Sequence, residues 1–289
     1  MGVTMFKLEY TKNLIHCWVE SWGVENVYVA YSGGKDSEVL LHIARGLYPE
    51  IKAVFSNTGL EFPEIVKHVK SHDNVTVIRP KVPFHKVIER WGWPVVNKEV
   101  AKSISRYRNT KLQDQKDYRL NGKIIDGKRA TVGVIPKKWH FLIDAPFKIS
   151  DMCCTQLKKN PFKKYERETG HKPMIGIMAG DSNARKMEIA NRGCNVYDAK
   201  SPQSRPLANW TDKDVYEYID IFGVEICEVY SMGHERTGCA FCLFGADQEK
   251  KKTGSNKYEK MRITHPKLYD YCINKLGAGA VMDFVGIDY

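Results

Sequence analysis

The chain has 289 residues, 43% of them hydrophobic, and a formal net charge of +11 at pH 7. This length and composition are typical of a globular protein with a large buried core. No apolar run approaches the roughly 18 residues of a membrane-spanning helix, and the first residues lack a secretory signal. We therefore expect a cytoplasmic protein with no membrane contact and with acidic partners such as nucleotides or nucleic acids.

Helices and strands alternate in the first third of the chain. Apolar residues recur on one helical face over residues 4–23. Short apolar runs then predict strands, and amphipathic segments between them predict helices: strands at 27–31, 51–57 and 75–80, helices at 37–48 and 63–72. This alternation indicates an α/β fold with a doubly wound parallel sheet, whose ligands bind at the carboxyl ends of the strands.

The pattern changes in the middle of the chain. Residues 97–150 interrupt the alternation and are predicted to be an insertion, after which a strand resumes at 174–180. A helix at 210–223 begins at the capping residue Thr211 or Asp212. The predicted parts are an N-terminal helix (1–26), a nucleotide-binding domain (27–242) that contains the insertion, and a helical C-terminal extension (243–289).

The loop after the first strand is the most informative segment. It reads Ser32-Gly33-Gly34-Lys35-Asp36-Ser37 and leads directly into a helix. Glycines let backbone N–H groups approach a phosphate, and the helix dipole favours its negative charge. Asp36 is suited to hold Mg²⁺, and Lys35 to neutralise charge on a leaving group. The alternative is an ordinary glycine-rich turn with no ligand.

The order of residues in this loop differs from a Walker A motif, which has Ser or Thr after the lysine. The loop resembles the SGGxDS pyrophosphate loop of the PP-loop ATP pyrophosphatases. That resemblance implies that ATP and Mg²⁺ bind here, with the β- and γ-phosphates in the loop and the reaction at the α-phosphate.

Basic residues cluster in the predicted insertion. The segment from Asn97 to His140 contains twelve lysines and arginines but only four acidic residues, and Tyr107, Tyr118 and Trp139 lie among them. This mixture suits contact with a nucleic-acid backbone and stacking on bases, so DNA or tRNA is a candidate partner of residues 97–140. The alternative is a solvated basic surface.

Four of the eight cysteines form two close pairs. Cys153 and Cys154 are adjacent, and Cys239 and Cys242 form a C-x-x-C motif. Adjacent cysteines rarely fit one tetrahedral zinc, whereas an iron–sulfur cube offers separate corners, so a [4Fe–4S] cluster is favoured over zinc or a redox dithiol. The isolated cysteines are expected to be buried; they are Cys17, Cys194, Cys227 and Cys272.

The two cysteine pairs downstream of the loop resemble the sulfonucleotide (APS/PAPS) reductase family, whose [4Fe–4S] members bind the cluster with such thiolates. Other segments agree with the family pattern in the same order: 56–65, 153–161, 175–185 and 205–219. The resemblance implies a fold of the adenine nucleotide α-hydrolase type.

The same resemblance implies roles for individual residues. Asn57, Thr58, Gly59 and Glu61 belong to the segment that lines the adenosine site and join Ser32–Ser37 as nucleotide-binding residues. Besides Lys35 and Asp36, the catalytic set would include two further basic residues, Lys158 and Arg185.

Departures from the reductase pattern are equally informative. Leu157, Met178 and Ala179 stand where the family pattern has arginines or their neighbours, which would hold the anionic sulfonucleotide. The sequence ends GAVMDFVGIDY, without the ECGLH-like tail that carries the reductase nucleophile, and Cys272 lies in a helical apolar pattern.

The first hypothesis is therefore an ATP pyrophosphatase with a [4Fe–4S] cluster, which adenylates an oxygen of its substrate, expected to be a nucleic acid, so that sulfur can replace it. Its sulfur would come from a partner such as a cysteine desulfurase. The second is a genuine APS or PAPS reductase, with Lys158, Arg185 and Arg236 binding sulfate. The third is a non-catalytic module that binds nucleotide and nucleic acid.

Overall fold

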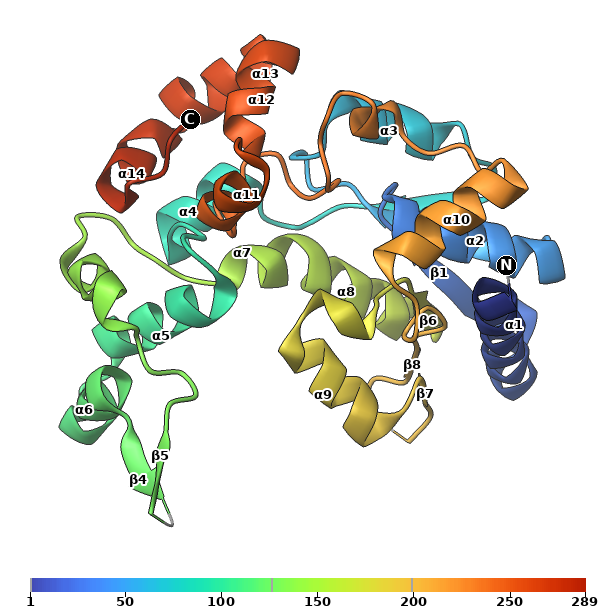
Figure 1. Cartoon of the computed structure of the whole chain (residues 1–289), viewed down its shortest axis with the longest axis horizontal. Helices are drawn as coiled ribbons and strands as arrows, with labels where there is room; N and C mark the ends of the chain where they lie inside the picture. Colours follow the sequence, from blue (N-terminus) through green and yellow to red (C-terminus); the bar gives the residue numbers. More distant parts are fainter. Residues whose placement is uncertain (1, 126, 199) are drawn as a thin grey trace. The chain divides into compact units, whose positions relative to one another are not determined.

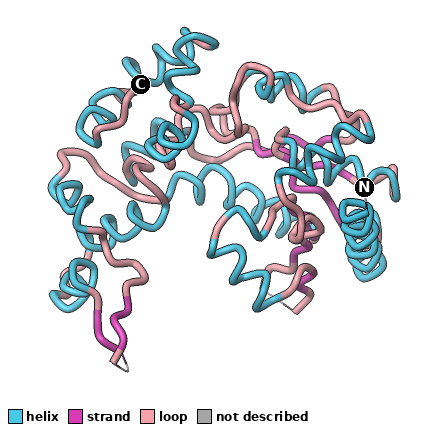
Figure 2. The backbone as a smooth tube through the Cα atoms, viewed as in Figure 1, coloured by secondary structure: helices cyan, strands magenta, loops and turns pink. Residues whose placement is uncertain are grey.

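The computed structural model describes residues 2–125, 127–198 and 200–289, whose helices and strands are drawn in Figures 1 and 2. The chain divides into two compact units. Unit 1 consists of Met1–Asn57, Glu61–Arg79 and Asn160–Thr237. Unit 2 consists of Thr58–Leu60, Pro80–Lys159 and Gly238–Tyr289. The segment predicted as an insertion thus falls in the same unit as the C-terminal helices.

Unit 1 is built around a six-stranded sheet with the order β3–β2–β1–β6–β8–β7. Its strands are β1 (Val27–Tyr31), β2 (Lys52–Ser56), β3 (Val75–Ile78), β6 (Lys172–Ile175), β7 (Asn195–Val196) and β8 (Gln203–Ser204). Neighbouring strands are parallel except for the edge pair β7–β8, which is antiparallel. The predicted α/β fold with a mainly parallel sheet is confirmed, and the antiparallel edge is an addition to it.

The strand order changes direction at β1, which pairs with β2 on one side and with β6 on the other. In open α/β sheets such a reversal creates a crevice at the carboxyl ends of the two central strands, where ligands bind. The loop Ser32–Gly34 leaves β1 at this end, and residues 176–182 leave β6 there. The topology therefore places the glycine-rich loop at the position expected for a ligand.

Helices cover both faces of the unit 1 sheet. They are α1 (Gly2–Trp22), α2 (Lys35–Leu47), α3 (Pro63–Lys70), α8 (Asn160–Thr169), α9 (Asn183–Arg192) and α10 (Asp212–Phe222), with short 3-10 turns at Val24–Asn26, Ala179–Asp181 and Glu228–Tyr230. Tyr28 of β1 packs on Phe162 and Tyr165 of α8. Tyr31 bonds to Glu38 of α2. Because side chains alternate along a strand, these two tyrosines mark opposite faces.

Helix α10 begins at a capping box. The Thr211 hydroxyl accepts a hydrogen bond from the Asp214 N–H at 3.3 Å, and the Asp214 carboxylate accepts one from the Thr211 N–H at 2.7 Å. This arrangement satisfies two N–H groups at the helix start. Thr211 is therefore the cap, and Asp212 is left available for another contact.

Unit 2 is mainly helical. Its elements are α4 (Phe84–Trp91), α5 (Lys98–Asn109), α6 (Gln113–Asn121), the antiparallel hairpin β4 (Lys123–Ile125) and β5 (Lys128–Ala130), a 3-10 segment (Lys137–Asp144), α7 (Met152–Cys154), α11 (Ala246–Thr253), α12 (Lys257–Thr264), α13 (Pro266–Asp270) and α14 (Ala278–Val285). π-Helical turns follow α7 at Thr155–Lys159 and α13 at Tyr271–Lys275. Among the described residues, no helix is both long and apolar enough to cross a membrane.

Helix α5 is held in unit 2 by one buried face and one arginine. Val100, Ala101 and Ile104 are buried. The Arg108 guanidinium donates hydrogen bonds to four backbone carbonyls, those of Ile143 (2.7 Å), Phe147 (2.6 Å), Leu142 (2.7 Å) and Ala145 (2.9 Å). A guanidinium has five fixed N–H donors, so it can fasten the segment 142–147 to the end of α5. Arg108 is therefore a structural residue of unit 2.

Candidate functional site

The glycine-rich loop of unit 1 is ordered by its two serines. The Ser37 hydroxyl donates to the Gly34 carbonyl at 2.9 Å and accepts from the Ser32 N–H at 3.1 Å. The Gly34 N–H lies 3.3 Å from the Ser32 hydroxyl oxygen. Gly33 has φ +70°, and a Cβ there would lie 2.8 Å from Ile65 of α3, so both conformation and packing require glycine. The loop thus has a fixed path at the start of α2.

Lys35 is the first residue of α2 and is buried. Its ammonium group lies 2.7 Å from Asp36 Oδ1 and 2.7 Å from Asp212 Oδ1. Burial alone would lower the pKa of Lys35, but the hydrogen bonds that its ammonium donates to Asp212 and Asp36 outweigh burial and raise the pKa. Lys35 is therefore a fixed positive charge in the loop.

Three carboxylates lie near one another at this end of the sheet. Burial raises the pKa of Asp36; Lys35 opposes that shift, while the charges of Asp181 and Asp212 add to it. Carboxylates that lie close together are favourable partners for a divalent cation, because the cation relieves their repulsion. Asp181 follows β6 and Asp212 begins α10. The arrangement can therefore hold Mg²⁺ next to phosphate oxygens.

The loop has neighbours that the sequence did not indicate. The Lys35 N–H donates to the Tyr230 hydroxyl at 2.8 Å. A Cβ on Gly34 would lie 2.3 Å from Thr237 Oγ1, and one on Gly176 would lie 3.0 Å from the Asp36 carbonyl oxygen. Asp212 lies in the segment 205–219 that agrees with the family pattern, and Tyr230 and Thr237 lie farther along the chain. The sequence did not indicate that any of the three contacts the loop, because only the fold brings them there.

The other predicted nucleotide residues fall in both units. Asn57 and Glu61 belong to unit 1, whereas Thr58 and Gly59 belong to unit 2. The Asn57 N–H donates to the Ile78 carbonyl at 2.9 Å, which extends the β2–β3 pairing. The Thr58 hydroxyl accepts from the Leu60 N–H at 3.2 Å. A role for the segment in binding adenosine stays a prediction.

The two remaining predicted catalytic residues are also separated. Arg185 begins α9 in unit 1, and its guanidinium pairs with the Asp181 carboxylate. Lys158 lies in unit 2, where its charge lowers the pKa of Cys153. In unit 1, Lys35, Asp36 and Arg185 thus lie near the carboxylates of Asp181 and Asp212. Lys158 lies near the cysteines of unit 2.

Unit 2 contains all four cysteines of the two predicted pairs. Cys153 and Cys154 form the last turn of α7, and Cys239 and Cys242 lie in the loop before α11. Burial raises the pKa of Cys153, and the charges of Cys239, Cys242 and Cys154 raise it further. The Cys242 N–H donates to the Cys239 carbonyl at 3.1 Å in a tight turn. Residues 85 or more positions apart in the sequence therefore converge.

The isolated cysteines differ from one another in exposure. Cys227 and Cys272 are buried as predicted, and burial raises the pKa of Cys272 to about 12. The prediction is wrong for Cys17, which is exposed, and for Cys194, which is partly exposed. Ile15, Trp18 and Val19 are buried and form the face of α1 that packs on the core, so Cys17 lies on the face exposed to solvent.

Sequence analysis also missed a cluster beside the loop, formed by Glu38 of α2 with His68 and His72. The two histidines are four residues apart in the sequence, a spacing that places them on one helical face and is known from metal sites. That spacing was the available signal.

Comparison with known proteins identifies the family. Residues 26–243 match the phosphoadenosine phosphosulfate reductase domain. Because this match covers most of the chain, the chain belongs to the phosphoadenosine phosphosulfate reductase family, as the loop and cysteine motifs predicted. The family is enzymatic, and the reaction of this chain is a separate question.

Individual relatives are distant. An uncharacterised protein of Methanocaldococcus jannaschii is 23% identical over 255 residues, which cover 86% of this chain but 47% of that protein, so the chain spans about half of that relative. An adenosine 5'-phosphosulfate reductase of Rhodococcus erythropolis is 23% identical over 225 residues, covering 76% of this chain and 69% of the reductase. The crystal structure of a phosphoadenylyl-sulfate reductase from Candida auris is 15% identical, with a TM-score of 0.46, covering 79% of this chain and 87% of that one.

Proposed function

We propose that this chain is an ATP pyrophosphatase that adenylates a substrate oxygen in preparation for sulfur transfer. The observation that carries the proposal is the loop Ser32–Ser37 at the carboxyl end of β1, with the Lys35 ammonium fixed between Asp36 and Asp212. A helix N-terminus, a fixed cation and converging carboxylates together suit a Mg²⁺–triphosphate.

In the proposed reaction the substrate oxygen attacks the α-phosphorus of ATP. The bond from this phosphorus to the bridging oxygen breaks, and pyrophosphate leaves. Lys35 and the loop amides stabilise the charge that develops on the leaving group. The terminal sulfur of a persulfide donor, such as a cysteine desulfurase, then replaces the adenylated oxygen, which departs with AMP. A second thiol, acting as the two-electron reductant, cleaves the resulting S–S bond and leaves the sulfur on the substrate.

The four cysteines of unit 2 are proposed to hold a [4Fe–4S] cluster. The four thiols come as one adjacent pair and one C-x-x-C pair. Adjacent cysteines rarely fit one tetrahedral zinc, whereas a cube offers each thiolate an iron of its own. When bound, such a cluster offers sulfur ligation or electron transfer.

Two further observations support the fit of a cluster. The buried Tyr258 hydroxyl has no hydrogen-bond partner in the described part of the chain, and the charges of Cys242 and Cys239 act on it. An O–H donor directed at thiolate or sulfide would be satisfied. Lys158 is near Cys153, and the Lys257 ammonium lies 3.0 Å from the Cys239 carbonyl oxygen, so positive charge is present to balance a negatively charged cluster.

The second candidate, a sulfonucleotide reductase, is favoured by the relative from Rhodococcus. Three features of this chain count against it. Leu157 and Met178 are apolar and buried where the reductase pattern has arginines or their neighbours. Cys272, which this alternative would use as nucleophile unless another thiol serves, is fully buried. A buried thiol with a raised pKa is a poor nucleophile.

Substrate preference tests the proposal. Anaerobically purified protein is titrated with ATP·Mg²⁺ and with adenosine 5'-phosphosulfate, and release of pyrophosphate and of sulfite is measured. We expect tighter binding of ATP, with pyrophosphate release that depends on an acceptor. Preference for the sulfonucleotide with sulfite release would support the reductase instead, and ATP binding without turnover under any acceptor would leave a binding module.

A nucleic-acid acceptor is proposed from the surface of α5. Lys98, Lys102 and Arg106 are exposed and spaced four residues apart, so they form a basic stripe opposite the buried face of the helix. Such a stripe can follow a phosphate backbone. Arg108, on the same helix, is occupied by backbone carbonyls and stands outside the stripe.

Two variants separate these roles. Changing Lys98, Lys102 and Arg106 together to Ala should lower the log–log salt slope of duplex DNA binding by about 2.7, without lowering the melting temperature. Arg108→Ala should instead destabilise unit 2 by roughly 3 kcal/mol, because several hydrogen bonds to a charged group are lost. Filter binding to DNA and tRNA and thermal denaturation are the measurements. Unchanged binding of every nucleic acid by the triple variant would point to a small-molecule acceptor.

A further inference from the structure

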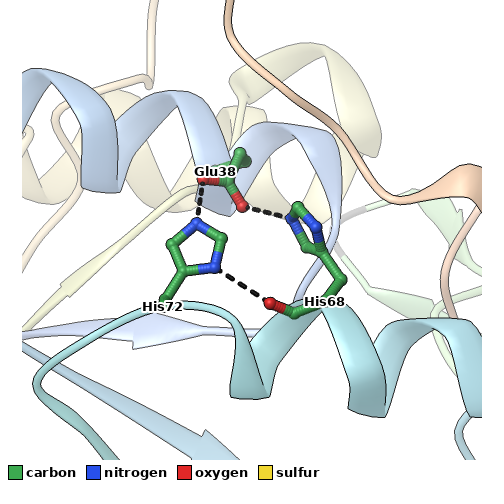
Figure 3. A group of neighbouring side chains, drawn as sticks. All are labelled: Glu38, His68 and His72. Atoms are coloured by element: carbon green, nitrogen blue, oxygen red, sulfur yellow. Dashed lines mark hydrogen bonds and ion pairs between the residues drawn. The ribbon is translucent and has the colours of Figure 1, made fainter.

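Glu38, His68 and His72 form a compact cluster in unit 1 (Figure 3). His68 Nε2 lies 2.8 Å from one carboxylate oxygen of Glu38, and His72 Nε2 lies 2.8 Å from the other. The side chain of Glu38 is 6% exposed, whereas those of His68 and His72 are 13% and 22% exposed. The carboxylate is thus enclosed, and the imidazoles connect it to solvent.

If the His72 ring is neutral, it has only one N–H group for its two contacts, so one contact has no proton. Its Nδ1 lies 2.9 Å from the His68 carbonyl oxygen, and its Nε2 faces the Glu38 carboxylate. Both partners only accept hydrogen bonds, while a neutral imidazole has a single N–H to donate. With Nδ1–H donated to the carbonyl, the lone pair of Nε2 points at a carboxylate. That contact requires a positive charge, either a second proton or a cation.

We propose that Glu38, His68 and His72 bind a divalent transition-metal ion of the zinc class, through Nε2 of each histidine and one oxygen of Glu38. Two imidazoles and a carboxylate form a ligand set typical of zinc sites with one open coordination position. A metal-bound histidine commonly donates its other N–H to a backbone carbonyl, as His72 does to His68.

A shared cation suits this cluster better than two protonated rings. The ring centroids of His68 and His72 are 4.9 Å apart, and the charge of Arg45 acts on His72 as well, so two imidazolium charges would repel each other and Arg45. One ion satisfies both Nε2 atoms at once. Tyr31 donates its hydroxyl to Glu38, which orients the carboxylate and leaves its other oxygen for the metal.

The location gives the site a structural consequence. Glu38 lies in the first turn of α2, directly after the glycine-rich loop. His68 lies in the last turn of α3, and His72 follows just after the end of this helix. The same helix α3 contributes Ile65 and Val69, which pack closest to Gly33. A metal ion here would therefore connect α2, which follows the loop, to α3, which packs against it. The proposal does not depend on which nucleotide the loop binds.

Zinc binding by the full-length protein tests the site. Protein with its cysteine site already loaded anaerobically is incubated with Zn²⁺, desalted and analysed for zinc, and zinc-edge X-ray absorption determines the ligands. We expect this cluster to bind one zinc per chain. The zinc should have nitrogen and oxygen neighbours at about 2.0–2.1 Å rather than sulfur at about 2.3 Å. Zinc should also raise the melting temperature.

Three variants decide the outcome. His72→Gln and His68→Gln should each weaken zinc affinity by more than the 10–100-fold that loss of an outer-shell partner costs. His16→Gln is the matched control, because His16 lies 3.1 Å from Glu20 in an exposed pair, and it should keep the zinc. The proposal is wrong if the wild type retains no zinc, if sulfur is its only ligand, or if His72→Gln binds it unchanged.

Discussion

Replacing Cys239 with Ser is expected to abolish the brown colour of anaerobically purified protein, together with its bound iron and sulfide. Cys153, Cys154, Cys239 and Cys242 converge in unit 2, and the wild type should contain about four irons and four sulfides per chain if they ligate a cube. Removing one of four thiolates leaves an iron with an open, oxidisable corner. Absorbance and iron and sulfide assays measure the loss.

Cys17→Ser is the control for this experiment. Cys17 is an exposed thiol on α1 of unit 1, so its removal should change neither the colour nor the iron content. Stoichiometric zinc without iron in anaerobic protein would contradict the cluster. Wild-type iron in the Cys239→Ser protein would show that another residue supplies the ligand.

Local sequence patterns predicted several elements of unit 1, because each depends on neighbouring residues. The β-branched and aromatic run of β1 packs as a strand, and Thr211, one of the two predicted caps, is the cap of α10. The loop and the cysteine pairs were recognisable for the same reason, because the residues that define each motif are close together in the sequence. The strand predicted at 174–180 is wrong for most of its length, because β6 is Lys172–Ile175 and Ala179–Asp181 form a 3-10 turn.

Long-range contacts were not predictable in this way. Asp212 and Tyr230 reach Lys35 across 177 and 195 residues of sequence, and nothing in the sequence indicated either contact. Arg108 was counted with the other basic residues of the insertion, since charge alone cannot separate a guanidinium that binds backbone carbonyls from one that faces solvent. The distinction depends on where segment 142–147 folds.

Gly34→Val is expected to lower ATP affinity at least ~100-fold. Gly34 has φ −92° and ψ 153°, a conformation that valine adopts freely, so the backbone of the loop need not change. The added Cβ would lie 2.3 Å from Thr237 Oγ1 and 3.3 Å from the Tyr230 hydroxyl. The Thr237 side chain must therefore move, and the valine crowds the side of the loop on which Thr237 and Tyr230 lie. Losing two charge-assisted hydrogen bonds to phosphate costs roughly 3 kcal/mol or more.

Gly46→Ala, in the same helix, is the matched control. Gly46 is exposed, nothing lies within 4 Å of its added Cβ, and alanine should stabilise the helix by about 0.5–1 kcal/mol without affecting ATP. Gly33 is less suitable for the test, because its φ of +70° and its contact with Ile65 would make a substitution damage folding too. Calorimetric titration with ATP·Mg²⁺ and thermal denaturation compare the variants. If Gly34→Val folds and binds ATP as tightly as Gly46→Ala, the phosphates lie outside this loop, and the proposed pyrophosphatase loses its principal support.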